Sequence, residues 1–598
     1  MVIREYSKVE LVFSSSESEA VKIALVNLRR DLIRTLDCSV TAGGIIRILV
    51  GTVGNLPELD KKADISKLQA EDGTYRKEAF LIQEKDGELL IAGTDRRGTI
   101  YGIYDFCEWL GVSPWYFFAD VPVRRRSEVV IENGYCKVDY PSVEYRGIFI
   151  NDEEELEHWV WRYMGETTIG VKTYEKIFEL LLRLKLNYIW PAMHVNSFNL
   201  KQENGALANR MGIVVGTSHC DMLMRSNNRE WKPWLANKGY TDVEYDFSIP
   251  GRNREILKEY WRESVEQNRD FEVSYTVGMR GIHDSGFETK SLEGLTGEKL
   301  LKAKIELLES VMAAQQEILS ETLDTEPMKT FVPYKEVLEL YDNGLKVPED
   351  LTLIWTNDNY GYVRRYPGEK EKARKSGNGI YYHNSYWAPP GASYLFICSI
   401  PMSHTRNELL KAYKEGIQKV WVTNFGAIKP LEQQLSFYAK LAWEADGDAN
   451  RDLETFDETI FLTRWLDSMF TGQPGKAAAP LLLEFDQLTN ARKLEHMDDD
   501  CFSQTAFGDE AAARMHRYEY ICRELEKIYE NLPEQEKDAF FQMILMKVQA
   551  AYFTNGMYYY ADRSRLCIRQ GKNSDAKRYT DKSHAFDLAR RKLLYYNN

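Results

Sequence analysis

Two short polar segments, each following an apolar run, hold the residues best suited to chemistry. Lys335 and Glu336 come after residues 330–332, and the sequence Asn-Asp-Asn at 357–359 comes after residues 351–355. Carboxylic acids can donate or accept a proton during a reaction. Paired carboxylates are the usual equipment for hydrolysing a glycosidic bond, because one protonates the leaving oxygen while the other activates water or attacks the sugar. These segments therefore indicate a hydrolytic site.

A strand-then-helix rhythm from residue 145 onwards predicts how these segments are positioned. The helical pattern is clearest at 174–186, where Ile177, Leu180, Leu181 and Leu184 share one face. Eight strands within about 280 residues are typical of a (β/α)8 barrel, whose catalytic side chains follow the strands. A doubly wound open sheet is the alternative, although no glycine-rich phosphate-binding fingerprint supports it. The predicted strands are 145–150, 187–190, 212–215, 272–277, 330–332, 351–355, 379–382 and 419–422.

Two further regions flank the predicted barrel at 141–445. Residues 1–140 combine helical patterns with a pair of apolar strands, and predict a small α/β domain. Strand patterns then disappear, and residues 446–598 predict a helical domain with breaks near 472–475 and Pro533. The predicted fold class is α/β, with a central (β/α)8 TIM-type barrel, a small N-terminal α/β domain and a C-terminal α-helical domain.

In a barrel, the residues just past each strand lie on one face. This face would bring together carboxylates, cations, histidines and aromatic side chains. Arginine binds a carboxylate with two parallel hydrogen bonds, so Arg280 and Arg225 are candidates for binding a substrate carboxylate. The candidate residues at the strand ends are Asp152, Trp190, His219, Asp221, Arg280, Asp284, Lys335, Glu336, Asn357, Asn359, His383 and Tyr386.

These candidates also have structural interpretations. Glu336 could complement the dipole at the start of a helix, and Asp284 could cap a helix or pair with Arg280. His219 and His383 could form structural hydrogen bonds. The acidic run at 153–157 indicates a solvated loop. A functional site is expected because these residues converge on one face of the barrel.

A metal site or a nucleophile is the other alternative at this face. His219, Asp221 and His283 could form a two-histidine, one-carboxylate site, but they lack a local ligand spacing such as HExxH. Ser218 and Cys220 lack the elbow motif of an activated nucleophile. We therefore expect no metal and no other cofactor.

Composition and charge limit the partners. The chain has 598 residues and a formal net charge of −14, which argues against nucleic acid because phosphate binding requires a basic surface. Eight scattered cysteines without CxxC spacing indicate neither a zinc site nor a disulfide framework. The start has no signal-peptide pattern and no apolar run of about 18 residues occurs. We expect a cytoplasmic protein without membrane contact, or a secreted one if a signal has been removed.

A series of motifs between about residue 90 and residue 446 permits a comparison with known families. In order they are GVSPWYFFADVPV, YRGIFINDEE, NYIWPAM, GIVVGTSH, YTVGMRG, YKEVLELYDNG, VPEDLTLIWTNDNYGYVRR, YYH, NFGAIKPLE and LAWEAD. Together they resemble glycoside hydrolase family 115, the α-glucuronidases that remove glucuronic or 4-O-methylglucuronic acid from xylan. The resemblance implies the three-part architecture above and inversion at the anomeric carbon.

The resemblance also implies roles for individual residues. Asp284, Glu336 and Asn359 match positions around the scissile bond, and Asp221 is a reserve carboxylate. An inverting pair of carboxyl groups is expected to lie roughly 6.5–9.5 Å apart. The residues that match positions holding the uronic acid are Arg280, His383 and Tyr386. Further expected substrate contacts are His219, Lys335, Asn357, Asp152 and Trp190.

The chain departs from the family pattern at several places. Cys220 and Asp221 stand where the family has His-Glu, Leu200-Lys201 stand where it is acidic, and Asn357 stands where an aspartate is usual. The family's C-terminal β-rich domain has no counterpart in the printed sequence. We expect an inverting exo-α-glucuronidase acting on xylan or another uronic-acid-capped glycan. The alternative is a non-hydrolytic protein that binds such a glycan, and a homodimer is compatible with either.

Overall fold

The computed structural model describes residues 1–151, 153–282, 285–287, 289–386, 388, 393–447 and 457–597. An eight-stranded parallel sheet lies at its centre. Its strands are β9 (Tyr145–Phe149), β10 (Tyr188–Trp190), β11 (Val214–Val215), β12 (Ser274–Thr276), β13 (Met328–Phe331), β14 (Thr352–Thr356), β15 (Asn378–His383) and β16 (Val420–Asn424). Each strand overlaps one of the eight predicted apolar runs. The runs are visible in the sequence because parallel strands are buried on both faces and are therefore continuously apolar.

The sheet curls into a barrel. Neighbouring strands run in chain order from β12 to β16 and continue through β9 and β10 to β11. The end strands β11 and β12 meet through a parallel bridge between Val215 and Val273. The (β/α)8 prediction is therefore confirmed. The open doubly wound alternative is wrong, because an open sheet would leave both end strands unpaired.

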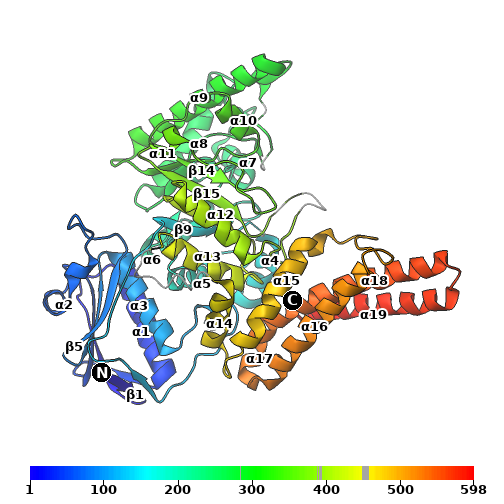
Figure 1. Cartoon of the computed structure of the whole chain (residues 1–598). Coiled ribbons are helices and arrows are strands. Elements are labelled where there is room, and N and C mark those ends of the chain that lie inside the picture. The colour runs from blue at the N-terminus through cyan, green and yellow to red at the C-terminus, as the bar shows by residue number, and fades with distance from the viewer. Residues whose placement is uncertain are drawn as a thin grey trace.

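Helices follow most of the strands and surround the barrel (Figure 1). In α5 the spacing of apolar residues predicts the buried face correctly, since Ile177, Leu180 and Leu181 are buried. The helices between the strands include α5 (Val171–Arg183), α6 (Gln202–Met211), α7 (Asn227–Lys238), α8 (Arg252–Asn268), α9 (Gly297–Thr322), α10 (Glu336–Asp342), α11 (Glu369–Lys372) and α12 (Met402–Lys414), and α13 (Glu432–Glu444) follows β16.

Large side chains fill the interior of the barrel. Phe149, Trp190 and Tyr381 belong to one buried cluster, and Trp190 Nε1–H donates to the Tyr188 hydroxyl over 2.8 Å. A Cβ on Gly216, directly after β11, would lie 2.0 Å from that hydroxyl, so a side chain cannot fit there. The interior is a packed core. A substrate therefore has room only above it, at the carboxyl ends of the strands.

A mixed sheet of six strands forms the N-terminal part of the chain, blue in Figure 1. The two apolar strands that were predicted as a pair, 80–85 and 88–93, are antiparallel to each other. Helices α1 (Glu19–Leu36) and α3 (Arg96–Leu110) contribute to its buried core. In sheet order the strands are β3 (Ser39–Val40), β2 (Lys8–Val12), β4 (Ile46–Thr52), β6 (Glu88–Gly93), β5 (Phe80–Lys85) and β8 (Cys136–Asp139).

Buried ion pairs join this N-terminal sheet region to the barrel. Arg146 on β9 is fully buried and its Nη2 lies 2.6 Å from Glu78. Arg183 on α5 pairs with Asp31 on α1, also at 2.6 Å. Removing one partner of such a pair leaves a buried charge without compensation, so these contacts fix the two regions against each other.

Helices alone form the described part of the chain from residue 457 to residue 597. α18 and α19 run as a long antiparallel hairpin that extends away from the barrel in Figure 1. These helices are α14 (Glu458–Met469), α15 (Gly475–Ala491), α16 (Glu510–Asn531), α17 (Glu534–Phe540), α18 (Met546–Arg569) and α19 (Asn573–Asn597), with a π-helical turn η10 (Phe541–Leu545) before α18. Among all described helices, none combines the length and apolar character that crossing a bilayer requires.

Candidate active site

Aromatic and imidazole rings gather at the carboxyl ends of the strands, where Tyr381 of the barrel core contacts them. Tyr381 and His383 lie on β15, with ring centroids 4.3 Å apart. Tyr334 follows β13, and its ring lies 4.8 Å from that of His219, which follows β11. Tyr386 lies 4.9 Å from His383, and its hydroxyl is 3.4 Å from the Tyr334 hydroxyl. We call these five residues the mouth cluster.

An arginine–carboxylate pair adjoins the mouth cluster. Arg280 donates from Nε to Oε1 of Glu336 and from Nη2 to Oε2, both over 3.0 Å. The N–H of Phe287 also donates to Oε1, over 3.2 Å. The Arg280 side chain is 4% exposed, whereas that of Glu336 is 26% exposed. The carboxylate therefore reaches solvent while the guanidinium lies behind it.

Both histidines of the mouth cluster are neutral at physiological pH. Burial lowers the pKa of His383 to about 3, and the neighbouring His219 and Lys335 act in the same direction. Burial, together with the positive charges of Arg280 and Lys335, lowers the pKa of His219 well below its usual value. A neutral imidazole can accept a hydrogen bond or a proton, so the cluster contains two uncharged acceptors.

Asn357, which follows β14, fixes the tautomer of His383. Its Oδ1 accepts from the backbone N–H of His383 over 3.0 Å and lies 2.7 Å from Nδ1 of the same residue. Because a backbone N–H can only donate, the Asn357 atom at this position is the oxygen, and Nδ1 must carry the imidazole proton. The other ring nitrogen, Nε2, is then an acceptor for a sugar hydroxyl or for a proton.

Lys335 connects β13 to α10 in a strained backbone conformation. Its φ of 52° and ψ of −128° lie in a region that residues with a side chain rarely occupy. Its Nζ lies 5.4 Å from the centre of the Tyr334 ring. Partial desolvation of the ammonium, followed by the charge of Arg280, lowers its pKa. Strain of this kind is stored most often at functional sites, where surrounding contacts hold it.

Asp221 is buried, with 6% of its surface exposed. Its Oδ2 lies 3.5 Å from the Ser218 hydroxyl and 3.7 Å from the Cys220 sulfur. Burial raises the pKa of this carboxyl well above its usual value, and the negative charges of Glu153 and Glu230 raise it further. A raised pKa favours the protonated form of Asp221, which suits a proton donor better than a charged base.

Residues 153–157 do not form the predicted solvated loop. They begin helix α4 (Glu153–Trp159), and the Glu153 carboxylate is buried. It accepts hydrogen bonds of 2.6–2.9 Å from four consecutive backbone N–H groups, those of residues 193–196. The carboxylate thus fixes the loop after β10. The prediction was wrong because these partners lie some 40 positions away in the chain.

The other predicted residues have varied placements. Trp190 is fully buried in the barrel core, which gives its predicted substrate contact no support. Asn359 is half-buried in the turn after β14, where the Asp358 carboxylate accepts from two backbone N–H groups of the same turn. Asp152, His283 and Asp284 lie outside the described residues. Among the residues that the structure describes, no group of three or more potential ligands is placed to hold a metal ion.

Two members of the mouth cluster, Tyr334 and Tyr381, were not among the residues predicted from the sequence. Tyr381 lies two positions before His383 on β15, so both side chains point to the same side of the strand. Tyr334 directly precedes the Lys335-Glu336 pair. Extending each strand-end segment by one or two inward-pointing positions would have found both residues.

Exposed apolar side chains of the barrel region lie at the same face. In the described parts of 141–445, five large apolar residues are exposed, all in segments that follow the carboxyl end of a strand. They are Trp161, Tyr163, Leu200, Tyr360 and Tyr362. The flat rings among them suit the apolar faces of pyranose sugars.

A comparison with known protein families agrees with this geometry. The profile described as Glycosyl hydrolase family 115 matches residues 138–496. The chain belongs to this family. A solved family GH115 4-O-methyl-α-glucuronidase, BtGH115A, described as having specificity for decorated arabinogalactans, is 32% identical to this family-115 chain. Its TM-score is 0.86, and the alignment covers 100% of this chain and 77% of BtGH115A.

More distant solved structures share the fold of this family-115 protein. A GH138 enzyme described as targeting pectin rhamnogalacturonan II is 12% identical with a TM-score of 0.56, and the alignment covers 98% of this chain and 74% of that enzyme. CpGH84B is 11% identical with a TM-score of 0.51, and the alignment covers 100% of this chain and 94% of CpGH84B. A search of curated protein sequences finds no match to the chain.

Family membership makes this protein a glycoside hydrolase and confirms the resemblance read from its motifs. The structure brings His219, Arg280, Glu336, His383 and Tyr386 to one face of the barrel, as predicted. Lys335 and Asn357 contact the same group of residues. The roles of these residues in the reaction stay predictions.

Proposed function

We propose that this family-115 glycoside hydrolase removes terminal α-linked glucuronic acid or 4-O-methylglucuronic acid from xylan or a related uronic-acid-capped glycan, with inversion. The description of BtGH115A as a 4-O-methyl-α-glucuronidase supports the sugar that is released. That description names decorated arabinogalactans, so the related glycans of the proposal include them. The proposed domains are residues 1–140, 141–445 and 446–598. A homodimer is compatible with this proposal.

One observation carries the proposal: a carboxylate already lies in the fork of Arg280. The two hydrogen bonds from Arg280 to Glu336 have the geometry in which a guanidinium binds any carboxylate. A uronic acid has a carboxylate, and this protein has a net charge of −14. Binding of the sugar therefore requires a local positive charge. Arg280 is that cation, and Lys335 adds a second positive charge nearby.

The proposed roles follow from the family resemblance and, for the described residues, from their contacts. Glu336 and Asp284 are the general acid and base, Asn359 lies at the scissile bond, and Asp221, whose pKa is raised by burial, is the reserve carboxylate. The residues proposed to hold the uronic acid and the adjacent sugar are Arg280, His383, Tyr386, His219, Lys335 and Asn357. The neutral Nε2 of His383 accepts a sugar hydroxyl in this scheme, because Asn357 holds the proton on Nδ1.

Product analysis tests this function directly. The purified protein is incubated with uronic-acid-capped oligosaccharides from glucuronoxylan and from arabinogalactan, and released uronic acid is measured by anion-exchange chromatography. Early-time proton NMR of the reducing sugar identifies the anomer, and the β-anomer as first product is the expected result for inversion. The α-anomer as first product would exclude inversion, and absence of release from both glycans would exclude the glucuronidase.

A non-hydrolytic binding protein is the second candidate, and three observations favour it. Glu336 is engaged by Arg280, Asp221 is buried with a raised pKa, and Asn357 stands where the family resemblance places an aspartate. Titration of the same oligosaccharides by calorimetry separates the two candidates. Binding of capped oligosaccharides without release of uronic acid would support the binding protein.

A further inference from the structure

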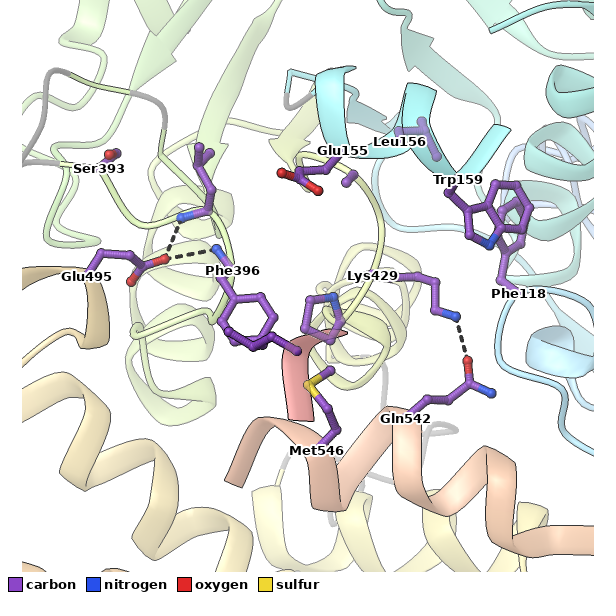
Figure 2. Close-up of a pocket in the computed structure, with 14 residues that line it drawn as sticks. Phe118, Glu155, Leu156, Trp159, Ser393, Phe396, Lys429, Glu495, Gln542 and Met546 are labelled. Carbon is purple, nitrogen blue, oxygen red and sulfur yellow. Dashed lines mark hydrogen bonds between the residues drawn. The ribbon is translucent and has the colours of Figure 1, made fainter. Parts of the chain in front are cut away.

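A cavity of about 470 Å³ opens between the barrel and the C-terminal helices, separate from the mouth cluster (Figure 2). Its barrel side comes from α4 and from the segments after β15 and β16. The opposite side comes from η9 (Leu494–His496), η10, α18 and α19. Its volume falls in the range of roughly 300–1,000 Å³ that is usual for sites of small ligands.

One short segment, 393–396, contacts the mouth cluster and also lines the cavity. Tyr394 pairs with Tyr386 through two backbone hydrogen bonds of 2.9 Å, and the two rings stack at 5.9 Å. Tyr386 belongs to the mouth cluster, whereas Ser393 and Phe396 line the cavity. Among the described residues, this segment therefore links a sugar bound beside Tyr386 to the cavity.

The C-terminal helical region holds that segment in place. Glu495 accepts hydrogen bonds from the N–H of Leu395 over 3.0 Å and of Phe396 over 2.9 Å, as the dashed lines in Figure 2 show. His496 Nε2 donates to the carbonyl of Ser393 over 2.9 Å, which places its proton on Nε2. These bonds fix both the wall of the cavity and the position of Phe396.

The lining combines flat apolar surfaces with separated polar groups. Trp159 stacks on Phe118 with ring centroids 5.5 Å apart, and Phe396 and Met546 add further apolar surface. Lys429 donates a hydrogen bond to Gln542 within the cavity (Figure 2). A pyranose ring has apolar C–H faces and a rim of hydroxyls, so it matches aromatic surfaces with a few hydrogen-bonding groups between them.

The charge of the lining favours a neutral ligand. Among the described residues that line the cavity there are two carboxylates, Glu155 and Glu495, and one ammonium, that of Lys429. An anionic ligand would be repelled by this balance. The mouth cluster has the opposite character, with Arg280 and Lys335 beside it, so the two sites select different parts of one glycan.

We propose that this cavity binds the neutral oligosaccharide chain to which the terminal uronic acid is attached. The inference rests on the proposed function: the uronic acid lies at the mouth cluster, the chain crosses segment 393–396, and its sugar rings pack against Trp159 and Phe396. The helices η10, α18 and α19 then contribute to the glycan specificity, because they supply Gln542, Met546 and Leu594 to the cavity lining.

Binding of neutral chains, measured apart from turnover, tests the proposal. Xylotetraose and a neutral arabinogalactan oligosaccharide are titrated by calorimetry into the full-length protein and into Trp159→Ala and Ala427→Trp. The first variant removes an aromatic surface, and the second fills the cavity from the segment after β16 without removing a wall. The matched control is Phe507→Ala, since Phe507 is 85% exposed and is not part of the cavity lining. Free glucuronic acid is titrated into each protein as well.

We expect both cavity variants to bind the neutral chain about tenfold or more weakly, with glucuronic acid binding and the control unchanged. Wild-type protein that binds neither neutral chain, or cavity variants that bind as wild type does, would overturn the proposal. Thermal unfolding identifies a Trp159→Ala protein that fails to fold, and Ala427→Trp then decides. Neutral-chain binding in the cavity without release of uronic acid would leave this site standing and refute the proposed glucuronidase alone.

Discussion

Arg280 and Glu336 form a two-point ion pair at the barrel mouth although 56 positions separate them in the chain. Arg280 follows β12 and Glu336 begins α10 after β13, so adjacent strands bring the two residues together. The pair joins a predicted substrate-binding group to a predicted catalytic group. A uronic acid that binds Arg280 must share or displace Glu336, and would thereby free that carboxylate for proton transfer.

Replacing Arg280 with methionine should weaken uronic acid binding. The substitution keeps much of the apolar stem but removes the charge, and truncating one partner of a buried charge pair costs roughly 2–5 kcal/mol of binding free energy. Calorimetric titration with glucuronic acid measures the loss. Arg364→Met is the matched control, because Arg364 is exposed and pairs with Asp358 in a nearby turn. Equal affinities of Arg280→Met and wild type would remove Arg280 from the sugar site.

Replacing Glu336 with glutamine should abolish most turnover while sugar binding persists. The amide keeps the shape but has no transferable proton, and general acid–base groups contribute typically 10²–10⁴-fold to the rate. Glu339→Gln is the control, since Glu339 lies in the same first turn of α10 and is exposed. A purely structural Glu336 predicts another outcome: a loss of stability, because the buried Arg280 loses its charged partner, with nearly unchanged kcat.

The buried neutral His383 should make the protein sensitive to acid. Its pKa in the folded protein is about 3, below the usual value of 6.5, so between these values the unfolded chain binds more protons than the folded one. This residue therefore makes the free energy of unfolding fall as pH falls from 6.5 towards 3, by up to about 1.4 kcal/mol per pH unit. Urea unfolding of wild type and His383→Gln at several pH values measures the difference, and identical slopes would contradict it.

Replacing Asn357 with aspartate should raise the pKa of His383. The new carboxylate would lie about as far from Nδ1 as the present Oδ1, which is 2.7 Å away, and an opposite charge at this range raises a histidine pKa by roughly 1–3 units. Nitrogen-15 NMR of the imidazole follows the titration. The acid limb of the pH–rate profile should move to higher pH by a similar amount. An unmoved titration would mean that Asn357 does not face Nδ1 in solution.

Asp486 should weaken the protein as pH rises. It is buried on α15, and burial raises its pKa from 3.8 to about 7, partly opposed by the charge of Lys547 on α18. The folded state then binds more protons than the unfolded chain between these values, so this contribution to stability is present at low pH and is lost as pH rises through about 7. In Asp486→Asn the fall in unfolding free energy between pH 5 and pH 8 should be smaller than in wild type. An equal fall would assign it to other groups.

Apolar periodicity alone was sufficient to place all eight barrel strands. The runs at 145–150 and 419–422 are short and continuous because parallel strands are buried on both sides, and chain order then determines which loops share a face. Motifs of fixed spacing were sufficient to indicate the family, since a motif is a local pattern that does not depend on distant contacts. These parts of the protein are determined by residues that are close together in sequence.

Contacts between distant segments depend on the closed fold, and sequence patterns do not reveal them. The fork between Arg280 and Glu336 exists only because β12 and β13 are neighbours at the correct register. Burial raises the pKa of Asp221, and the fold places Trp190 in the core, although both residues look available in the sequence. The cavity lies between the barrel and helices more than 100 positions away, as the bond from Lys429 to Gln542 shows. Burial and long-range geometry depend on the whole chain packing at once, and for that reason only the tertiary structure could decide them.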